Sequence, residues 1–151
     1  MGFNVDADTQ GAIIPRGQSF PECPPIKHPL KWNNTFGYMT MLSVVNGMEK
    51  ATGGINERGL SISGLWRDDT EYASLESAST ESPALYNIDL VSWVLGNFDN
   101  ITSLQEALAS VTVISSTNLD PCLNVLLHYI AIDRAGNSLI IEYKNGRLKT
   151  Y

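Results

Sequence analysis

The amino-acid sequence predicts an α+β domain in which two helices cover one face of an antiparallel sheet. Several short segments alternate between apolar and polar residues, which is typical of strands. A continuous stretch with helical spacing lies between them, and an Asn-Gly pair near the end of the chain indicates a hairpin. Strands come first, helices follow and strands return, an order typical of helices segregated on one side of a sheet.

The amino-terminal part is expected to hold three strands. They are predicted at residues 11–17, 36–45 and 60–66, the last with Ile62 and Trp66 on one face and Leu65 on the other. Residues 46–54 are predicted to be the turn that follows the second strand. Four prolines within residues 19–29 exclude regular structure there and indicate an exposed loop.

The middle of the chain predicts a helical hairpin. Residues 84–98 carry apolar side chains at helical spacing and predict one well-buried helix. The stretch from Thr102 to Gln105 fits a capping box, in which the threonine begins the second helix. The apolar face of that helix is expected to consist of Leu104, Ala107, Leu108 and Val111.

The last quarter of the chain predicts strands again. Residues 126–133 and 138–143 read as two strands, and Asn145-Gly146 is a strong signal for a hairpin turn. The return strand, residues 148–151, coincides with the end of the sequence. We therefore expect residues 1–151 to form a single, partial domain.

Composition limits the classes of function. The net charge of −6 provides no basic stripe for a nucleic-acid partner, and no apolar run approaches the roughly 20 residues of a membrane span. The first ten residues do not resemble a secretory signal, so a cytoplasmic location is the default expectation. The two cysteines, Cys23 and Cys122, are expected to be free thiols, and a single long-range disulfide is the alternative.

Sequence patterns alone do not reveal a catalytic site. His28 and His128 are a hundred residues apart, so we expect no metal site and no cofactor. His128, within an apolar strand, is more easily read as a core histidine with a hydrogen-bond partner than as a ligand. Asp6, read alone, fits a turn better than a catalytic role.

A family resemblance adds what these patterns lack. The segments "GFNVD", "IIPRG", "KWNNTFGYMTM", "GGINERGLSISGLW", "SWVLGNFDNITSLQEAL" and "LHYIAIDRAGNSLIIEYKNGRLKTY" occur in this order. Together they resemble the amino-terminal half of the choloylglycine hydrolase family, the bile salt hydrolases and penicillin V acylases. The resemblance implies the N-terminal nucleophile (αββα) fold, here in part. It also implies hydrolysis of amide bonds by an N-terminal cysteine whose own α-amine is the base.

The resemblance assigns two catalytic residues. Asp6 falls on the carboxylate that holds the α-amine, and Trp66 falls where the family uses a backbone N–H in its oxyanion hole. Phe3 stands where the family has an arginine, a departure that removes a charge. The nucleophilic cysteine would precede Gly2 by about 15 residues, a strand and a turn. We therefore expect the sequence to be a fragment without its nucleophile.

The resemblance also implies a substrate pocket of three loops. Its residues would be Asp8 in the first loop, Met41, Leu42 and Met48 in the second, and Ile114 and Leu123 in the third. Methionine and leucine form adaptable apolar walls. Ordinary core packing is the equally weighted alternative for these apolar side chains.

Two functions from different classes stay open. One is a hydrolase of a small-molecule acyl amide, favoured by Asp6 and by the intact strand through Trp66. The other is a non-catalytic relative, a binding or vestigial domain, favoured by Phe3. Bile salts, penicillin V and acyl homoserine lactones are all compatible with the resemblance, and Trp66 favours the penicillin acylases. Apolar faces left uncovered in a fragment would favour homo-oligomers.

Overall fold

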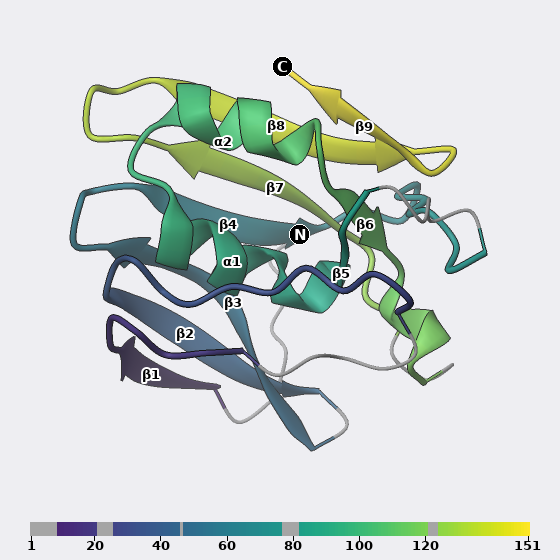
Figure 1. The fold of residues 1–151 in the computed structure, drawn as a ribbon, viewed down its shortest axis with the longest axis horizontal. Coiled ribbons are helices and arrows are strands. Elements are labelled where there is room, and N and C mark those ends of the chain that lie inside the picture. The colour runs from purple at the N-terminus through teal and green to yellow at the C-terminus, as the bar shows by residue number, and fades with distance from the viewer. Residues whose placement is uncertain (1–8, 21–25, 46, 77–81, 121–123) are drawn as a thin grey trace.

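The computed structural model describes residues 9–20, 26–45, 47–76, 82–120 and 124–151. Within them, seven antiparallel strands form one sheet in the order β1-β2-β3-β4-β7-β8-β9 (Figure 1). The strands are β1 (Thr9–Ile14), β2 (Tyr38–Val45), β3 (Met48–Asn56), β4 (Ser61–Trp66), β7 (Leu127–Ile132), β8 (Ser138–Lys144) and β9 (Arg147–Thr150).

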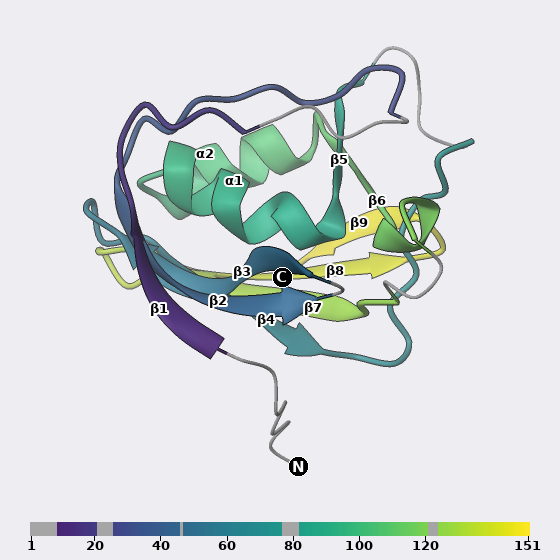
Figure 2. The same cartoon turned by 90° about the horizontal axis from the view of Figure 1, so that it is seen from below.

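A second layer covers one face of this sheet. It contains the helices α1 (Leu90–Asn97) and α2 (Ile101–Leu108) and the single-turn 3-10 helices η1 (Asn87–Asp89) and η2 (Ser116–Asn118). Two short strands, β5 (Ala84–Tyr86) and β6 (Thr112–Ile114), pair in parallel beside them. Figure 2 shows this layer on one side of the sheet, which confirms the predicted α+β arrangement. No helix in the described residues is long and apolar enough to cross a membrane.

The core lies between the sheet and the helices. Alternate side chains of the central strands point toward the helices, including Ile62, Tyr129 and Ile141. They belong to one buried cluster with Leu95 of α1 and Leu104 of α2. Burial of an apolar side chain of this size stabilises the fold by about 1.5–3 kcal/mol. The predicted apolar face of the second helix is therefore the face that packs.

The prediction that residues 46–54 form a turn is wrong. Met48–Asn56 is the strand β3, which pairs with β2 on one edge and with β4 on the other. Its glycines hid the strand, but one of them is required by the packing. A Cβ on Gly54 would lie 2.1 Å from the carbonyl oxygen of Met39 in β2. The close approach of two strands selects glycine there.

The prediction of one helix over residues 84–98 is also wrong at its amino-terminal end. Residues 84–86 are extended and pair with β6, Leu85 opposite Val113, and α1 begins only at Leu90. The apolar spacing of this stretch fits both a helix and a buried strand. The partner strand, nearly thirty residues away in sequence, decides between them.

The second helix begins before the predicted capping box. Asn100 is its N-cap, and its side-chain Oδ1 accepts a hydrogen bond from the N–H of Ser103 at 2.9 Å. Thr102 lies inside the first turn and is exposed. Asparagine is at least as good an N-cap as threonine, and Asn100 precedes the apolar residue Ile101. The capping-box prediction was therefore wrong in its residue and right in the presence of a helix.

The hairpin predicted at Asn145-Gly146 is confirmed. Both residues have positive φ angles, 51° and 71°, as a type I′ turn requires. β8 and β9 pair on either side of it, from Lys144 opposite Arg147 to Ile141 opposite Thr150.

Candidate functional site

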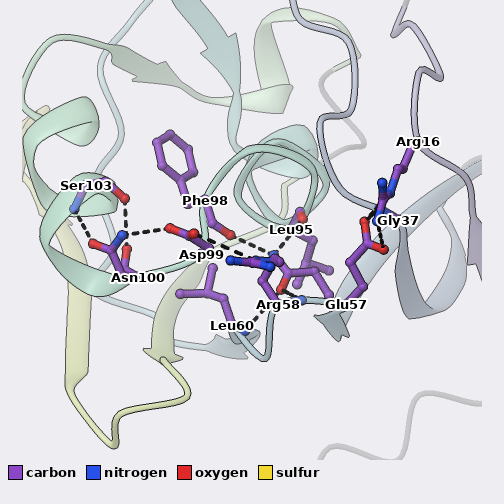
Figure 3. Close-up of polar contacts among 11 residues, drawn as sticks. Arg16, Gly37, Glu57, Arg58, Leu60, Leu95, Phe98, Asp99, Asn100 and Ser103 are labelled. Atoms are coloured by element: carbon purple, nitrogen blue, oxygen red, sulfur yellow. Dashed lines mark hydrogen bonds and ion pairs between the residues drawn. The ribbon is translucent and has the colours of Figure 1, made fainter.

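The turn between β3 and β4 fixes the start of the strand that leads to the candidate site. The amide nitrogen of buried Asn56 donates to the carbonyl oxygens of Leu95, at 2.9 Å, and Phe98, at 2.7 Å. Its Oδ1 accepts from the N–H groups of Arg58, at 3.0 Å, and Leu60, at 3.1 Å. Figure 3 labels the partners of these bonds, Arg58 and Leu60 in the turn and Leu95 and Phe98 at the end of α1. One side chain thus ties the sheet to the helical layer.

Glu57 adds a second tie from the same turn. Its carboxylate accepts hydrogen bonds from Arg16, at 2.6 and 2.5 Å, and from the N–H of Gly37, at 2.8 Å (Figure 3). The hydrogen bonds from Arg16 and then from Gly37 lower the pKa of this carboxyl below its ordinary value. The next residue, Arg58, approaches Asp99 to 3.9 Å. The residues of the motif "NERGL" therefore fix the start of β4 to the end of α1 and to the segments that carry Arg16 and Gly37.

β4 extends beyond one of its neighbours. Its pairing with β3 runs from Ser61 only to Ser63, opposite Gly53. Its pairing with β7 continues to Trp66, opposite Leu127. Gly64, Leu65 and Trp66 are therefore paired with β7, but they lie beyond the end of the β3–β4 ladder.

The backbone N–H of Trp66 points toward the β3 side of β4, beyond the last residue of the β3–β4 ladder. In an antiparallel ladder, alternate residues direct their N–H and C=O groups to the same neighbour. The N–H of Arg67 donates to the carbonyl oxygen of Leu126 at 2.9 Å, on the β7 side. The preceding residue, Trp66, therefore directs its N–H away from β7.

The indole of Trp66 is held beside this backbone. Its Nε1 donates to the carboxylate of Asp68 at 2.5 Å, and the side chain is 41% exposed. The Trp66 N–H, which points away from β7, and a half-exposed aromatic side chain thus belong to the same residue at the end of β4. The predicted alternation is confirmed, since Ile62 is buried and Leu65 is exposed on the opposite face.

A charged network holds the chain directly after Trp66. The guanidinium of Arg67 bonds Asp69, at 2.5 Å, and Glu142 of β8, and Lys144 lies 3.1 Å from Asp69. The hydrogen bond from Arg67 and then that from Lys144 hold the pKa of Asp69 well below its usual range. In the sequence, Asp68 and Asp69 are only part of a polar, charged stretch that follows Trp66. Their closeness to Arg67 can be seen in the sequence, but their proximity to Glu142 and Lys144 of β8 cannot.

His128 does not match its predicted role. It lies on β7 opposite Leu65, is only partly buried, and its Nδ1 is inaccessible without a hydrogen-bond partner in the described part of the chain. The expectation of a fully satisfied core histidine was wrong. Alternation places His128 on the same face of the sheet as Leu65, whose side chain offers no acceptor or donor.

The other candidate residues fall into different surroundings. Met48 and Ile114 pack in one small cluster around Tyr86, and Ile114 is fully buried. Leu42 packs against the main core, whereas Met41 is half-exposed on the opposite face of β2. The structure therefore brings Met48 and Ile114 together and directs Met41 away from the core. The remaining candidates, Asp6, Asp8 and Leu123, lie outside the described residues, as do Phe3, Cys23 and Cys122.

Metal-ligating side chains do not gather in the part of the chain that the structure describes. No group of three or more His, Cys, Asp or Glu residues there has a geometry that could hold a metal ion. The acids near β4 are instead occupied by Trp66, Arg67 and Lys144.

The family model of linear amide C–N hydrolases, choloylglycine hydrolase family, matches residues 1–151. The chain belongs to this family. It is 28% identical over 125 residues to a penicillin V acylase of Pectobacterium atrosepticum, covering 80% of this chain and 33% of that protein. It is 29% identical over 101 residues to a bile salt hydrolase/transferase of Clostridium perfringens, covering 65% and 30%. The chain thus spans about a third of the length of these choloylglycine hydrolase relatives.

Solved structures of the family share the fold. Penicillin V acylase from Agrobacterium tumefaciens superposes with a TM-score of 0.79 at 25% identity, over 100% of this chain and 43% of that one. A single-residue variant of conjugated bile acid hydrolase from Clostridium perfringens gives 0.75 at 20% identity, over 95% and 42%. The sheet and its helices are therefore part of the N-terminal nucleophile hydrolase fold, as the resemblance implied.

Proposed function

We propose that this segment forms the oxyanion-hole side of the site in a hydrolase of linear amide C–N bonds. The observation that carries the proposal is the end of β4, where the Trp66 N–H points away from β7. The Asn56 hydrogen bonds before this strand and the Arg67 network after it keep the N–H in a fixed direction. A donor must be fixed in this way to stabilise a charge that exists only in the transition state.

The Trp66 N–H would act on the carbonyl oxygen of the substrate. A nucleophile that adds to an amide carbonyl converts this oxygen into an oxyanion, and a backbone N–H can hydrogen-bond it. One such donor is worth about 10²–10³ in kcat. A backbone donor is independent of the side chain, so tryptophan can serve where relatives carry another residue.

The rest of the proposed chemistry comes from the family resemblance. An N-terminal cysteine thiolate adds to the carbonyl, the C–N bond breaks as the amine leaves with a proton, and water then hydrolyses the thioester. Asp6 would hold the α-amine that acts as base. In this proposal the cysteine is supplied by sequence outside the 151 residues, and the segment is part of a longer enzyme.

We further propose an aromatic acyl group as the preferred substrate class. The relatives are named for penicillin V and for bile salts. The half-exposed Trp66 indole lies beside the proposed oxyanion donor, and aromatic rings stack well on such a surface. This favours the phenoxyacyl group of penicillin V over the steroid of a bile salt.

A non-catalytic relative is the second candidate. Phe3 occupies the position that carries an arginine in the resemblance, and phenylalanine supplies no charge to a thiolate. In this alternative the same fold would bind an acyl amide without cleaving it.

The two candidates are separated by one measurement on the natural gene product. Its intact mass and N-terminal sequence would show whether the mature chain begins at a cysteine. If it does, we expect hydrolysis of penicillin V that a thiol reagent abolishes, with slower cleavage of a conjugated bile salt. A mature chain that starts at Met1 or Gly2 and cleaves neither amide would leave only the non-catalytic candidate.

The role of the Trp66 N–H has its own test in an active enzyme. Trp66→Pro removes the N–H, and we expect kcat to fall by about 10²–10³. Trp66→Ala keeps the N–H, so it should mainly raise KM by removing the aromatic wall. The N–H is not part of the β7 ladder, and circular dichroism would confirm that the proline variant folds. Equal kcat in both variants would contradict the assignment.

A further inference from the structure

Leu127, the first residue of β7, lies beyond the ladder that joins β7 to β8. That ladder ends at Tyr129, opposite Ile141. The carbonyl oxygen of Leu126 accepts a hydrogen bond from the N–H of Arg67, on the β4 side. Consecutive residues of a strand direct their backbone groups to opposite edges, so the N–H and C=O of Leu127 point toward the β8 side, past the end of that ladder.

The hydroxyl of Tyr72 binds both of these backbone groups. It donates to the carbonyl oxygen of Leu127 at 2.8 Å and accepts from the N–H of Leu127 at 3.2 Å. A phenol can do both, because its oxygen is a donor and an acceptor at once. The same hydroxyl lies 3.2 Å from that of Tyr129, which donates to the carbonyl oxygen of Asn87 at 2.9 Å. One side chain thus takes the place of a neighbouring strand for Leu127.

The segment that carries Tyr72 is fixed against the β8–β9 hairpin. The N–H of Glu71 donates to the carbonyl oxygen of Tyr143 at 3.0 Å, and the rings of Tyr143 and Tyr72 pack with centroids 5.2 Å apart. Glu71 also accepts from the N–H of Asn145 on its carboxylate and from the N–H of Gly146 on its carbonyl oxygen. Burial raises the pKa of the Tyr72 phenol above its ordinary value, so at neutral pH the phenol keeps the proton that it donates.

Leu127 connects this hydroxyl to the proposed oxyanion donor. It is the residue of β7 directly opposite Trp66. Its side chain also packs closely on β4, since a Cβ on Gly64 would lie 3.0 Å from Cδ1 of Leu127. A shift of Leu127 would therefore be transmitted to the end of β4, which carries the Trp66 N–H.

We propose that Tyr72 is a positioning residue, whose hydroxyl holds the Trp66 N–H in the direction that the oxyanion requires. The proposal rests on the proposed hydrolase function and adds a residue that acts through Leu127. Without the hydroxyl, the N–H and C=O of Leu127 would lose this partner, and the start of β7 would shift to regain hydrogen bonds. A misplacement of about 1 Å can cost about 10²-fold in rate.

Kinetics of the natural gene product test the proposal. Tyr72→Phe removes the hydroxyl and keeps the ring. We expect kcat to fall by about 10–10²-fold, less than for Trp66→Pro, and KM to stay within about twofold, because the donor acts only in the transition state. Tyr143→Phe removes a hydroxyl from the neighbouring ring and keeps both bonds to Leu127, so its kcat should be unchanged. An unchanged kcat in Tyr72→Phe, a rise of KM alone, or an equal loss in both variants would overturn the proposal.

A spectroscopic measurement separates this proposal from the hydrolase function. In NMR spectra of protein with isotope-labelled tryptophan, the backbone amide of Trp66 is identified as the signal that Trp66→Phe abolishes. This signal should shift in Tyr72→Phe and stay in place in Tyr143→Phe. A protein that cleaves no amide but shows this pattern would support the positioning of the N–H while refuting the hydrolase function. An unmoved signal in Tyr72→Phe would overturn the positioning role, even in an active hydrolase.

Circular dichroism shows whether Tyr72→Phe folds. If it does not, Thr70→Val takes its place, because Thr70 Oγ1 makes a longer bond, 3.4 Å, to the same carbonyl oxygen of Leu127. Thr70→Val should then lower kcat by a smaller factor and shift the same Trp66 signal. No change in either quantity would overturn the proposal.

Discussion

At the scale of single residues, the main finding is what the motif "NERGL" does. Asn56 uses its side-chain donors and acceptor on four backbone groups, two in the helical layer and two in its own turn. All four hydrogen bonds are needed, because a buried donor or acceptor that loses its partner destabilises the folded chain by the free energy of its desolvation. The motif thus positions β4, and with it Trp66, without being close to the proposed chemistry.

Asn56→Ala is therefore expected to destabilise the fold by about 2–4 kcal/mol, because two buried carbonyls and two N–H groups lose their partner. Denaturant unfolding followed by circular dichroism measures this. Asn33→Ala, at an exposed position, is the matched control and should stay within about 0.5 kcal/mol. Equal effects of the two changes would contradict the structural role of Asn56.

Gly54 and Gly11, on two strands of the same sheet, should differ in how well they tolerate alanine. A Cβ on Gly54 would meet the Met39 carbonyl oxygen at 2.1 Å, whereas a Cβ on Gly11 meets nothing within 4 Å. Gly54→Ala should cost at least about 2 kcal/mol, since backbone of a neighbouring strand would have to move. Gly11→Ala should be neutral or slightly stabilising. Thermal melts of both variants would test this, and a tolerated Gly54→Ala would refute the close approach of β2 and β3.

At the scale of elements, the start of α2 distinguishes two capping schemes. Asn100 accepts from Ser103 in the structure, whereas the sequence alone suggested Thr102 as the cap. Asn100→Ala should therefore destabilise the protein by about 1 kcal/mol and Thr102→Ala by much less. Urea unfolding of both variants measures the difference. If Thr102→Ala destabilised the protein more than Asn100→Ala, the predicted capping box at Thr102 would be correct after all.

Elements defined by local pattern could be predicted from the sequence, and those defined by distant partners could not. Residues 60–63 alternate between apolar and polar side chains, and Asn145-Gly146 permits the left-handed turn that its hairpin needs. Residues 46–54 and 84–89 carry ambiguous spacing. Their strands exist because β2, β4 and β6 supply hydrogen bonds from elsewhere in the chain.

The candidate site also has features that the sequence predicts and features that depend on distant partners. Alternation located Trp66 at the end of a strand, and the family resemblance gave that position a role. The direction of its N–H depends on the register with β7, which no local pattern contains. The Arg67 network likewise needs Glu142 and Lys144, more than seventy residues away in sequence. The roles of Met48 and Ile114 stay predictions, and both side chains also serve core packing.

At the scale of the whole molecule, carboxylates join parts that are distant in sequence. Glu57 ties the β3–β4 turn to Arg16 and Gly37, and Asp69 ties the end of β4 to Lys144. Asp133 accepts from Asn137 in its own turn and from the N–H of Ile101 at the start of α2. Hydrogen bonds lower the pKa of all three carboxyls, and the largest cause is Arg16 for Glu57, Arg67 for Asp69 and Asn137 for Asp133.

The lowered pKa values predict acid sensitivity. A carboxyl whose pKa is lower in the folded chain stabilises the fold above its unfolded pKa, near 4.5 for Glu57 and 3.8 for Asp133, and loses that contribution as the pH falls through the folded value. We expect Tm to be level from pH 7 to about 5 and to fall steeply below pH 4.5. Glu57→Gln, which cannot titrate, should lower Tm at pH 7 and reduce the slope below pH 4.5. Glu106→Gln, exposed on α2, is the control, and an identical slope in the Glu57 variant would contradict this coupling of the β3–β4 turn to Arg16.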